Sequence, residues 1–163
     1  MADEMYAFLD LKGVKGSSLD SDFKDQIPLQ SVSWGVTNHG NFGHGSGGSK
    51  HHGQIHELSI SKIMCRATPT LMQYCTMGDH IPEGTLSLCW QSGDTKKAYY
   101  EVKLKNIRVT SHQIAGHGGA QHPMESISLQ FAVMHSTYNP QDNEGNVESG
   151  VEFGYDLQEH KKA

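Results

Sequence analysis

The chain has 163 residues, a formal net charge of −5 at pH 7 and a hydrophobic share of 36%. That length is enough for one folded unit with a sizeable core, so we expect residues 1–163 to form a single domain. The acidic balance lacks the basic footprint of a nucleic-acid-binding protein, and no window approaches the ~20 apolar residues of a membrane-spanning helix. We therefore expect no nucleic-acid partner and no membrane insertion.

The N-terminus and the cysteines indicate the compartment in which the chain folds. Residues Met1–Glu4 are acidic, and no apolar run follows a positive region, which argues against a secretory signal peptide. Cys65, Cys75 and Cys89 are odd in number and form no C-x-x-C pair, which fits reduced thiols. We expect a protein that folds in the cytosol.

Alternating apolar and small polar residues predict strands through most of the chain. A first strand is expected at 6–11, and residues 27–37 are expected to form one strand. Further strands are expected at 55–63, 85–90, 98–111, 127–133 and 151–157. The apolar positions change parity near Lys105–Asn106, which predicts a β-bulge there. Together these strands predict a small antiparallel β-barrel or sandwich, closed or nearly closed.

A single helix is predicted at 68–78, within this otherwise β-rich pattern. Thr68 is expected to be its N-cap, Pro69 suits the first helical position, and Gly78 suits the left-handed residue that ends a helix. Its apolar stripe is expected to consist of Leu71, Met72 and Cys75. At about ten residues the helix is too short to be stable alone, so we expect it to cover an open end or face of the β structure.

Residues 38–53 form a long loop that is rich in glycine and histidine. Its glycines are Gly40, Gly43, Gly45, Gly47, Gly48 and Gly53, and its histidines are His39, His44, His51 and His52. So many glycines do not fix a backbone, and unstructured loops of this length are usually functional or disordered. We expect this extended loop, with Asn38 and its four histidines, to contact a neighbouring subunit.

Several predicted strands carry serines on the face opposite their apolar residues. These serines are Ser31, Ser33, Ser59, Ser61, Ser126 and Ser128. A solvated sheet would normally carry more lysine and glutamate, so this face suits burial against another subunit or the neutral wall of a channel. The alternative is an ordinary water-exposed sheet decorated with serine.

The sequence disfavours both metal binding and enzyme activity. The loop histidines and His56 could bind zinc, copper or nickel, but their spacing matches no closed site and no cysteine or carboxylate lies among them. Their charge could instead make subunit stacking depend on pH. His117 lies among glycines, and no catalytic motif is present, so we expect no enzyme activity, no metal and no cofactor.

A monomeric barrel that binds a small molecule is the remaining alternative. It predicts a roomy apolar interior with a few converging polar groups, whereas a structural subunit predicts a filled interior. The aromatic residues are numerous enough to fill a small barrel, so we favour the filled interior.

The chain resembles the haemolysin-coregulated proteins (Hcp), the tube subunits of bacterial type VI secretion, nearly from end to end. The matching segments are 5–15, 32–35, the Gly-rich loop, 67–72, 99–111 with its KLKNIRVTS run, 116–119, 129–132 and 138–141. Each motif is weak alone, but their order and spacing together are specific to this family.

The resemblance implies a small β-barrel with one helix, six copies of which form a ring. Such rings stack into the inner tube of the machine, meet its spike and sheath components, and carry secreted effector proteins in the lumen. By position, Ser33 would face the lumen with Ser31 and Thr37, and the extended loop would reach the next ring. The protein would wait in the bacterial cytoplasm and leave without a signal peptide. The chain ends at Ala163, soon after the last strand, so no C-terminal toxin extension is expected.

Overall fold

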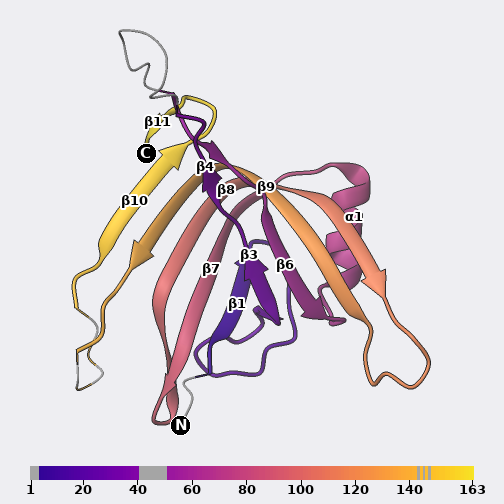
Figure 1. Cartoon of the computed structure of the whole chain (residues 1–163). Coiled ribbons are helices and arrows are strands. Elements are labelled where there is room, and N and C mark those ends of the chain that lie inside the picture. Colours follow the sequence, from indigo (N-terminus) through magenta and orange to yellow (C-terminus); the bar gives the residue numbers. More distant parts are fainter. Residues whose placement is uncertain (1–3, 41–50, 143, 145, 147) are drawn as a thin grey trace, which may run out of the picture.

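The computed structural model describes residues 4–40, 51–142, 144, 146 and 148–163. These residues are mainly β, and α1 (Thr68–Met77) is the one helix among them (Figure 1). Before it come β1 (Tyr6–Leu11), β2 (Ile27–Leu29), β3 (Ser31–Ser33), β4 (Val36–Thr37), β5 (Gln54–Ile55) and β6 (Leu58–Ile63). After it come β7 (Ile81–Ser92), β8 (Thr95–Ala115), β9 (Met124–Tyr138), β10 (Val151–Asp156) and β11 (Lys161–Lys162). The predicted mainly antiparallel β fold with one helix is confirmed.

The barrel wall is closed by a segment that changes partner. Antiparallel pairing runs from β1 through β7, β8 and β9 to β6. β2 pairs with β1, whereas β3, which follows directly in the chain, pairs with β6. Between them, Gln30 donates its backbone N–H to the carbonyl of Ser61 at 2.8 Å. The two ends of the wall are thereby joined, which removes the unpaired edges of an open sheet.

The long strand β9 carries the sheet beyond the barrel. Its first half pairs with β6 and its second half with β10, while β8 pairs along both halves. The sheet therefore extends away from the barrel toward β10, on the side opposite α1 (Figure 1). β4 and β5 form a separate two-stranded sheet at the base of the extended loop.

The prediction of one strand over residues 27–37 is wrong. The segment forms β2, β3 and β4, with its breaks at Gln30 and at Trp34–Gly35. Each break marks a change of partner, from β1 to β6 and then to β5. Apolar and polar residues alternate across the second break, but at the first break Gln30 and Ser31 are both exposed, and the apolar positions change from 27 and 29 to 32 and 34. Alternation reports which side of a sheet is buried and not which strand lies alongside.

The predicted bulge near Lys105–Asn106 is also wrong, although the parity change there is real. Asn106 has a left-handed φ of 52°, and the buried positions of β8 shift from 102 and 104 to 107 and 109. On β9, the neighbouring residues Phe131 and Ala132 are both buried. Both strands therefore change face together and keep their register. The register shift between β8 and β9 occurs instead between Val109 and Ser111.

The barrel interior is filled with aliphatic side chains. Those with almost no exposed surface include Leu9, Leu11, Ile27, Leu58, Leu71, Ile81, Leu86, Leu104, Ile107, Ile127 and Leu129. The residual space bounded by Trp34, Leu58, Leu86, Val102, Leu104, Phe131 and Met134 amounts to about 10 Å³. Such a space holds at most about one water molecule, so it does not provide the ligand chamber that a small-molecule carrier needs.

A second, smaller cluster lies on the outer side of β1 and β7. The rings of Phe8 and Phe23 stack in parallel with their centroids 4.5 Å apart, next to the buried Cys89. The loop between β1 and β2 supplies Phe23 and therefore covers this patch. Burial raises the pKa of the Cys89 thiol to about 12, so this thiol stays protonated and unreactive.

The helix α1 is attached to the barrel by its first turn as well as by its apolar face. Leu71 is fully buried in the core cluster, whereas Met72 is 43% exposed, so the predicted stripe is wrong at Met72. Gly78 has the predicted left-handed φ, 72°, and donates its N–H to the Tyr74 carbonyl at 3.0 Å. Thr68 is not the N-cap: it is the first helical residue, after Ala67. Its hydroxyl instead contacts a buried carboxylate, described below.

No helix in the described part of the chain is both long and apolar enough to cross a membrane.

Candidate functional site: a serine-lined sheet face

Seven serines gather on one outer face of the barrel wall, which we call the serine face. They are Ser31 and Ser33 of β3, Ser59 and Ser61 of β6, Ser111 of β8, and Ser126 and Ser128 of β9. They line a shallow hollow of about 220 Å³. No member of this face is charged, so it presents neutral hydroxyl groups over four adjacent strands.

The strand register orders these side chains into two rows. One row runs through Ser33, Ser59, Ser128 and Ser111, each paired with the next across neighbouring strands. The other runs through Ser31, Ser61, Ser126 and Gln113. Within the second row, the hydroxyl oxygens of Ser31 and Ser61 lie 2.6 Å apart and share a hydrogen bond. The intervening residues of the same strands, such as Ile60 and Ile127, are buried in the core, as the two-residue period of a strand requires.

The fourth strand joins these rows through a β-bulge at Thr110. Val109 pairs with Leu129 and Ser111 pairs with Ser128, so Thr110 is the extra residue on β8. Its hydroxyl lies 3.1 Å from the Ser128 carbonyl and 3.2 Å from a Glu57 carboxylate oxygen, and it can donate to either. The bulge reverses the parity of the strand, which turns Ser111 outward and His112 inward. The sequence interpretation missed Ser111 because nothing local marks Thr110 as unpaired.

The two ends of the serine face differ in chemistry. Beyond Ser61 and Ser126, the next cross-strand pair on this side is Ile63 and Met124, both partly exposed. Beyond Ser59 and Ser128, the wall continues to charged groups, including Arg108, whose guanidinium lies 2.9 Å from Nε2 of His80. Charge therefore begins only at the margin of the serine face.

Directly behind the serine face lies a buried network of ionisable side chains. Lys62 Nζ contacts Glu125 Oε2 at 2.5 Å, and His112 Nε2 contacts Glu125 Oε1 at 2.5 Å. The side chains of Lys62 and Glu125 are 0% exposed, and that of His112 is 2% exposed. Thr68 donates its hydroxyl to Glu125 Oε2 at 2.8 Å, which fixes the start of α1 to β9. The sequence does indicate a buried charge pair, because Lys62 and Glu125 occupy inward positions on strand faces that are otherwise apolar.

The electrostatics of this network favour an ionised carboxylate. Burial alone raises the pKa of Glu125, but hydrogen bonds from Lys62, His112 and Thr68 outweigh it and hold the pKa below its ordinary value. Lys62 Nζ also lies 3.2 Å from the Ile63 carbonyl, 3.3 Å from the Thr68 hydroxyl and 3.3 Å from Cys65 Sγ. By contrast, Nδ1 of His112 is buried and has no hydrogen-bond partner.

The remaining predicted site residues lie away from the serine face. Thr37 pairs with Gln54 in the small β4–β5 sheet, and its hydroxyl lies 3.1 Å from Nε2 of His56. The strand breaks before it, so alternation does not bring Thr37 onto the side that carries Ser31 and Ser33. The structure thus brings two of the three predicted lumen residues together.

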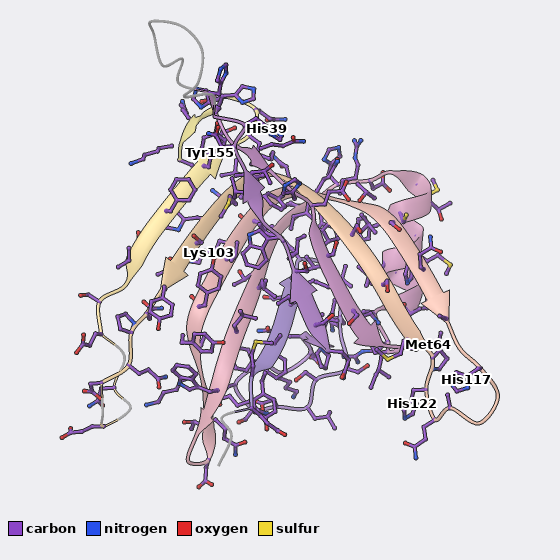
Figure 2. The ribbon with its side chains drawn as sticks, in the orientation of Figure 1. His39, Met64, Lys103, His117, His122 and Tyr155 are labelled. Atoms are coloured by element: carbon purple, nitrogen blue, oxygen red, sulfur yellow. The ribbon has the colours of Figure 1, made fainter. Side chains whose placement is uncertain are left out.

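The base of the extended loop is held at one end of the barrel. Asn38 donates its side-chain amide to the His51 carbonyl at 2.8 Å, and Nδ1 of His52 lies 3.3 Å from the Tyr155 hydroxyl. His39 is exposed near this end, while His117 and His122 lie at the opposite end of the molecule (Figure 2). His44 lies outside the described residues. Where side chains are described, no group of three or more histidine, cysteine or acidic residues is arranged to hold a metal ion.

The filled antiparallel barrel leaves no interior chamber for a small-molecule ligand, and its polar serine face lies on the outside of the wall. The family described as "Type VI secretion system effector, Hcp" matches residues 8–138, so the chain belongs to the Hcp family of type VI secretion proteins. "Protein hcp1" of Pseudomonas aeruginosa strain PAO1 is 30% identical over 157 residues, which cover 96% of this chain and 97% of that protein.

Solved structures agree with this assignment. A structure described as that of a type six secretion system protein has a TM-score of 0.91 at 28% identity, covering 98% of this chain and 100% of the other. Hcp1 from Salmonella typhimurium has a TM-score of 0.78 at 24% identity, covering 98% and 99% of the two chains. At the latter identity the similarity concerns the fold. The chain is thus a β-rich tube protein of type VI secretion.

Proposed function

We propose that six copies of this chain close into a ring and that the rings stack into the inner tube of a type VI secretion machine. The tube is expelled toward a target cell with effector proteins in its lumen. Family membership supports the tube role, and the filled barrel supports a structural and non-catalytic one. The observation that carries the proposal is the serine face, a neutral surface of seven serines on four adjacent strands with no charged member.

The serine face is proposed to form the wall of the lumen and to contact cargo. A single hydrogen bond exchanged with water contributes only about 0.5–1.5 kcal/mol net, so a few hydroxyl contacts retain a protein without trapping it. A charged wall would instead attract proteins of opposite charge and repel those of like charge. Ser33 and Ser31 provide the cargo contacts from β3, and Thr37 belongs to the base of the extended loop.

The extended loop is proposed to contact the neighbouring subunit or the next ring. Its base, formed by Asn38, His51 and His52, lies at one end of the barrel, and the loop between β8 and β9 lies at the other (Figures 1 and 2). Stacked rings would bring one end of a subunit against the opposite end of the next. The spike and sheath of the machine are the further proposed partners, and the protein is proposed to leave the bacterial cytoplasm through the machine itself.

Replacing Ser33 with arginine tests the lumen assignment. A long charged side chain in the middle of a serine row is expected to displace cargo, while rings form as before because Ser33 lies outside the barrel core. The matched control is Ser21→Arg, which changes an exposed serine of the loop between β1 and β2. Retention of one purified effector of the same machine is measured by co-elution, and ring formation by native mass spectrometry. Equal retention by Ser33→Arg and Ser21→Arg would show that the serine face is not the cargo wall.

A further inference from the structure

The buried network and the serine face are built on the same three strands. Lys62 follows Ser61 on β6, His112 follows Ser111 on β8, and Glu125 precedes Ser126 on β9. Because successive residues of a strand point to opposite sides, each member of the network lies directly behind a serine. A displacement of the network therefore moves the backbone that carries the serine rows.

The network is contacted from every element that packs around it. The groups that face the Glu125 carboxylate are the Lys62 ammonium from β6, the His112 imidazole from β8 and the Thr68 hydroxyl from α1. The Cys65 thiol, from the segment before α1, faces the Lys62 ammonium at 3.3 Å. Cys65 Sγ also accepts the backbone N–H of Ala67 at 3.4 Å, which extends the contact to the start of α1.

The charge of this network balances only while it carries no additional proton. One ammonium and one carboxylate compensate each other, and a neutral His112 donates from Nε2 and leaves its buried Nδ1 without a partner. A proton on Nδ1 would create a buried charge and an N–H without an acceptor, while a proton on Glu125 would remove the counter-ion of Lys62. Both are costly where water is excluded.

We propose that Lys62, Glu125 and His112 form a proton-controlled latch behind the serine face. While the latch carries no additional proton, it holds β6, β8, β9 and the start of α1 in the alignment that presents the two serine rows. Uptake of one proton at Nδ1 of His112 opens the latch, misaligns the rows and releases bound cargo in acid. This regulation rests on the proposed cargo-binding role of the serine face.

Hydrogen–deuterium exchange of the intact assembled protein tests the latch without any cargo. Exchange is followed from about pH 8 to about pH 4, the range that brackets histidine and carboxylate titration, and corrected for intrinsic exchange. Peptides covering 58–63, 110–115 and 124–130 are expected to lose protection together, about tenfold per pH unit, as uptake of one proton requires. β7, which does not contribute to the network, serves as the internal reference.

Two variants and one control complete the design. His112→Gln keeps an N–H donor toward Glu125 but does not titrate, so it is expected to retain protection at neutral pH and to shift or flatten the acid response. Glu125→Gln is expected to be less protected already at neutral pH. The control is His135→Gln, which changes a partly exposed histidine 3.6 Å from Glu152 and is expected to behave like the parent.

The outcomes separate the latch from the cargo role. The latch is overturned if the parent protein keeps full protection across the range, or if His112→Gln responds like the parent. His112→Gln carries this test even if Glu125→Gln fails to fold. Release of the effector used with Ser33→Arg is then measured over the same pH range, with His135→Gln as the reference. If the three segments open in acid and the effector stays bound, the release step is overturned. Failure of the Ser33→Arg test would instead count against the cargo wall and leave the exchange result standing.

Discussion

At the scale of single residues, Thr110 allows β8 to place Ser111 on the serine face and His112 in the buried network. Without the extra residue, the parity of β8 would place His112 outside and Ser111 inside. The bulge reverses that order. It is stabilised by the Thr110 hydroxyl, which lies within hydrogen-bond distance of the Ser128 carbonyl and the Glu57 carboxylate. Both the complete serine rows and the third member of the latch therefore depend on one unpaired residue, which is the kind of re-aiming that bulges provide.

Gly16 is a residue whose replacement should disturb a whole loop. A Cβ at this position would lie 2.2 Å from the Gln26 carbonyl oxygen, a backbone atom that is itself fixed in the loop over Phe8. Gly16→Ala is expected to lower the free energy of unfolding by about 1–3 kcal/mol, measured by urea denaturation. The control is Gly118→Ala, where an added Cβ meets nothing within 4 Å. Equal effects of the two substitutions would contradict this account.

At the scale of elements, α1 is held by contacts that its own sequence does not encode. Thr68, Pro69 and Gly78 correctly mark a helix of this length, and Gly78 ends it as predicted. The hydroxyl of Thr68 is used on Glu125, which is 57 residues away in sequence, and not on the free N–H groups of the first turn. A capping pattern is local, so it cannot show that a distant carboxylate is the preferred partner.

For the serine face and the barrel closure, too, the local sequence predicts which residues share a side of a strand but not which strands pair. Alternation over residues 31–33, 59–61 and 126–128 was sufficient to predict which serines share a side, because that period follows from strand geometry alone. It did not predict the change of partner at Gln30, the bulge at Thr110 or the buried Lys62–Glu125 pair. Each of these depends on which strand lies alongside, and that is decided by the whole sheet.

Acid should weaken the fold through Glu125. Its pKa in the folded protein is held below the ordinary value of 4.5, because hydrogen bonds to the carboxylate outweigh the opposing effect of burial. Glu125 therefore contributes stability that is present above the unfolded pKa and is lost as the pH falls through the folded pKa. Urea unfolding, repeated from about pH 7 downward through the carboxyl range, measures this loss, and Glu125→Gln is expected to lack it.

Removing one or both charges of the Lys62–Glu125 pair distinguishes the stability contributed by charge pairing from that contributed by packing. Glu125→Leu leaves the Lys62 ammonium buried without its counter-ion and is expected to cost about 3–5 kcal/mol at neutral pH. The double variant Lys62→Met with Glu125→Leu buries no unpaired charge and is expected to recover much of that loss. A double variant no more stable than the single one would show that the lost packing, and not the unpaired charge, dominates.

At the scale of the whole molecule, the barrel buries its apolar residues, whereas the sheet that extends beyond it leaves several of them exposed. The barrel has a filled interior and a closed wall, so it is complete within one chain. The sheet beyond it is not: Val151 and Phe153 of β10 are 74% and 45% exposed, next to the 46% exposed Tyr138 of β9. An exposed apolar surface of this kind is a common site of association. In the proposed ring, a second copy of the chain would cover it.

Placing a charge on this apolar strip should therefore prevent ring formation without unfolding the subunit. In Phe153→Asp, an unpaired carboxylate would be buried at the contact between copies, whereas in the free chain the same side chain remains in water. Native mass spectrometry is expected to show single chains of 18.0 kDa for Phe153→Asp and rings of six for the parent. Leu19→Asp, at a 93% exposed apolar residue of the loop between β1 and β2, is the matched control and should still form rings. If Phe153→Asp assembles as well as Leu19→Asp, the strip on β10 is not the contact between subunits. If the parent itself remains a single chain, the ring proposal is wrong.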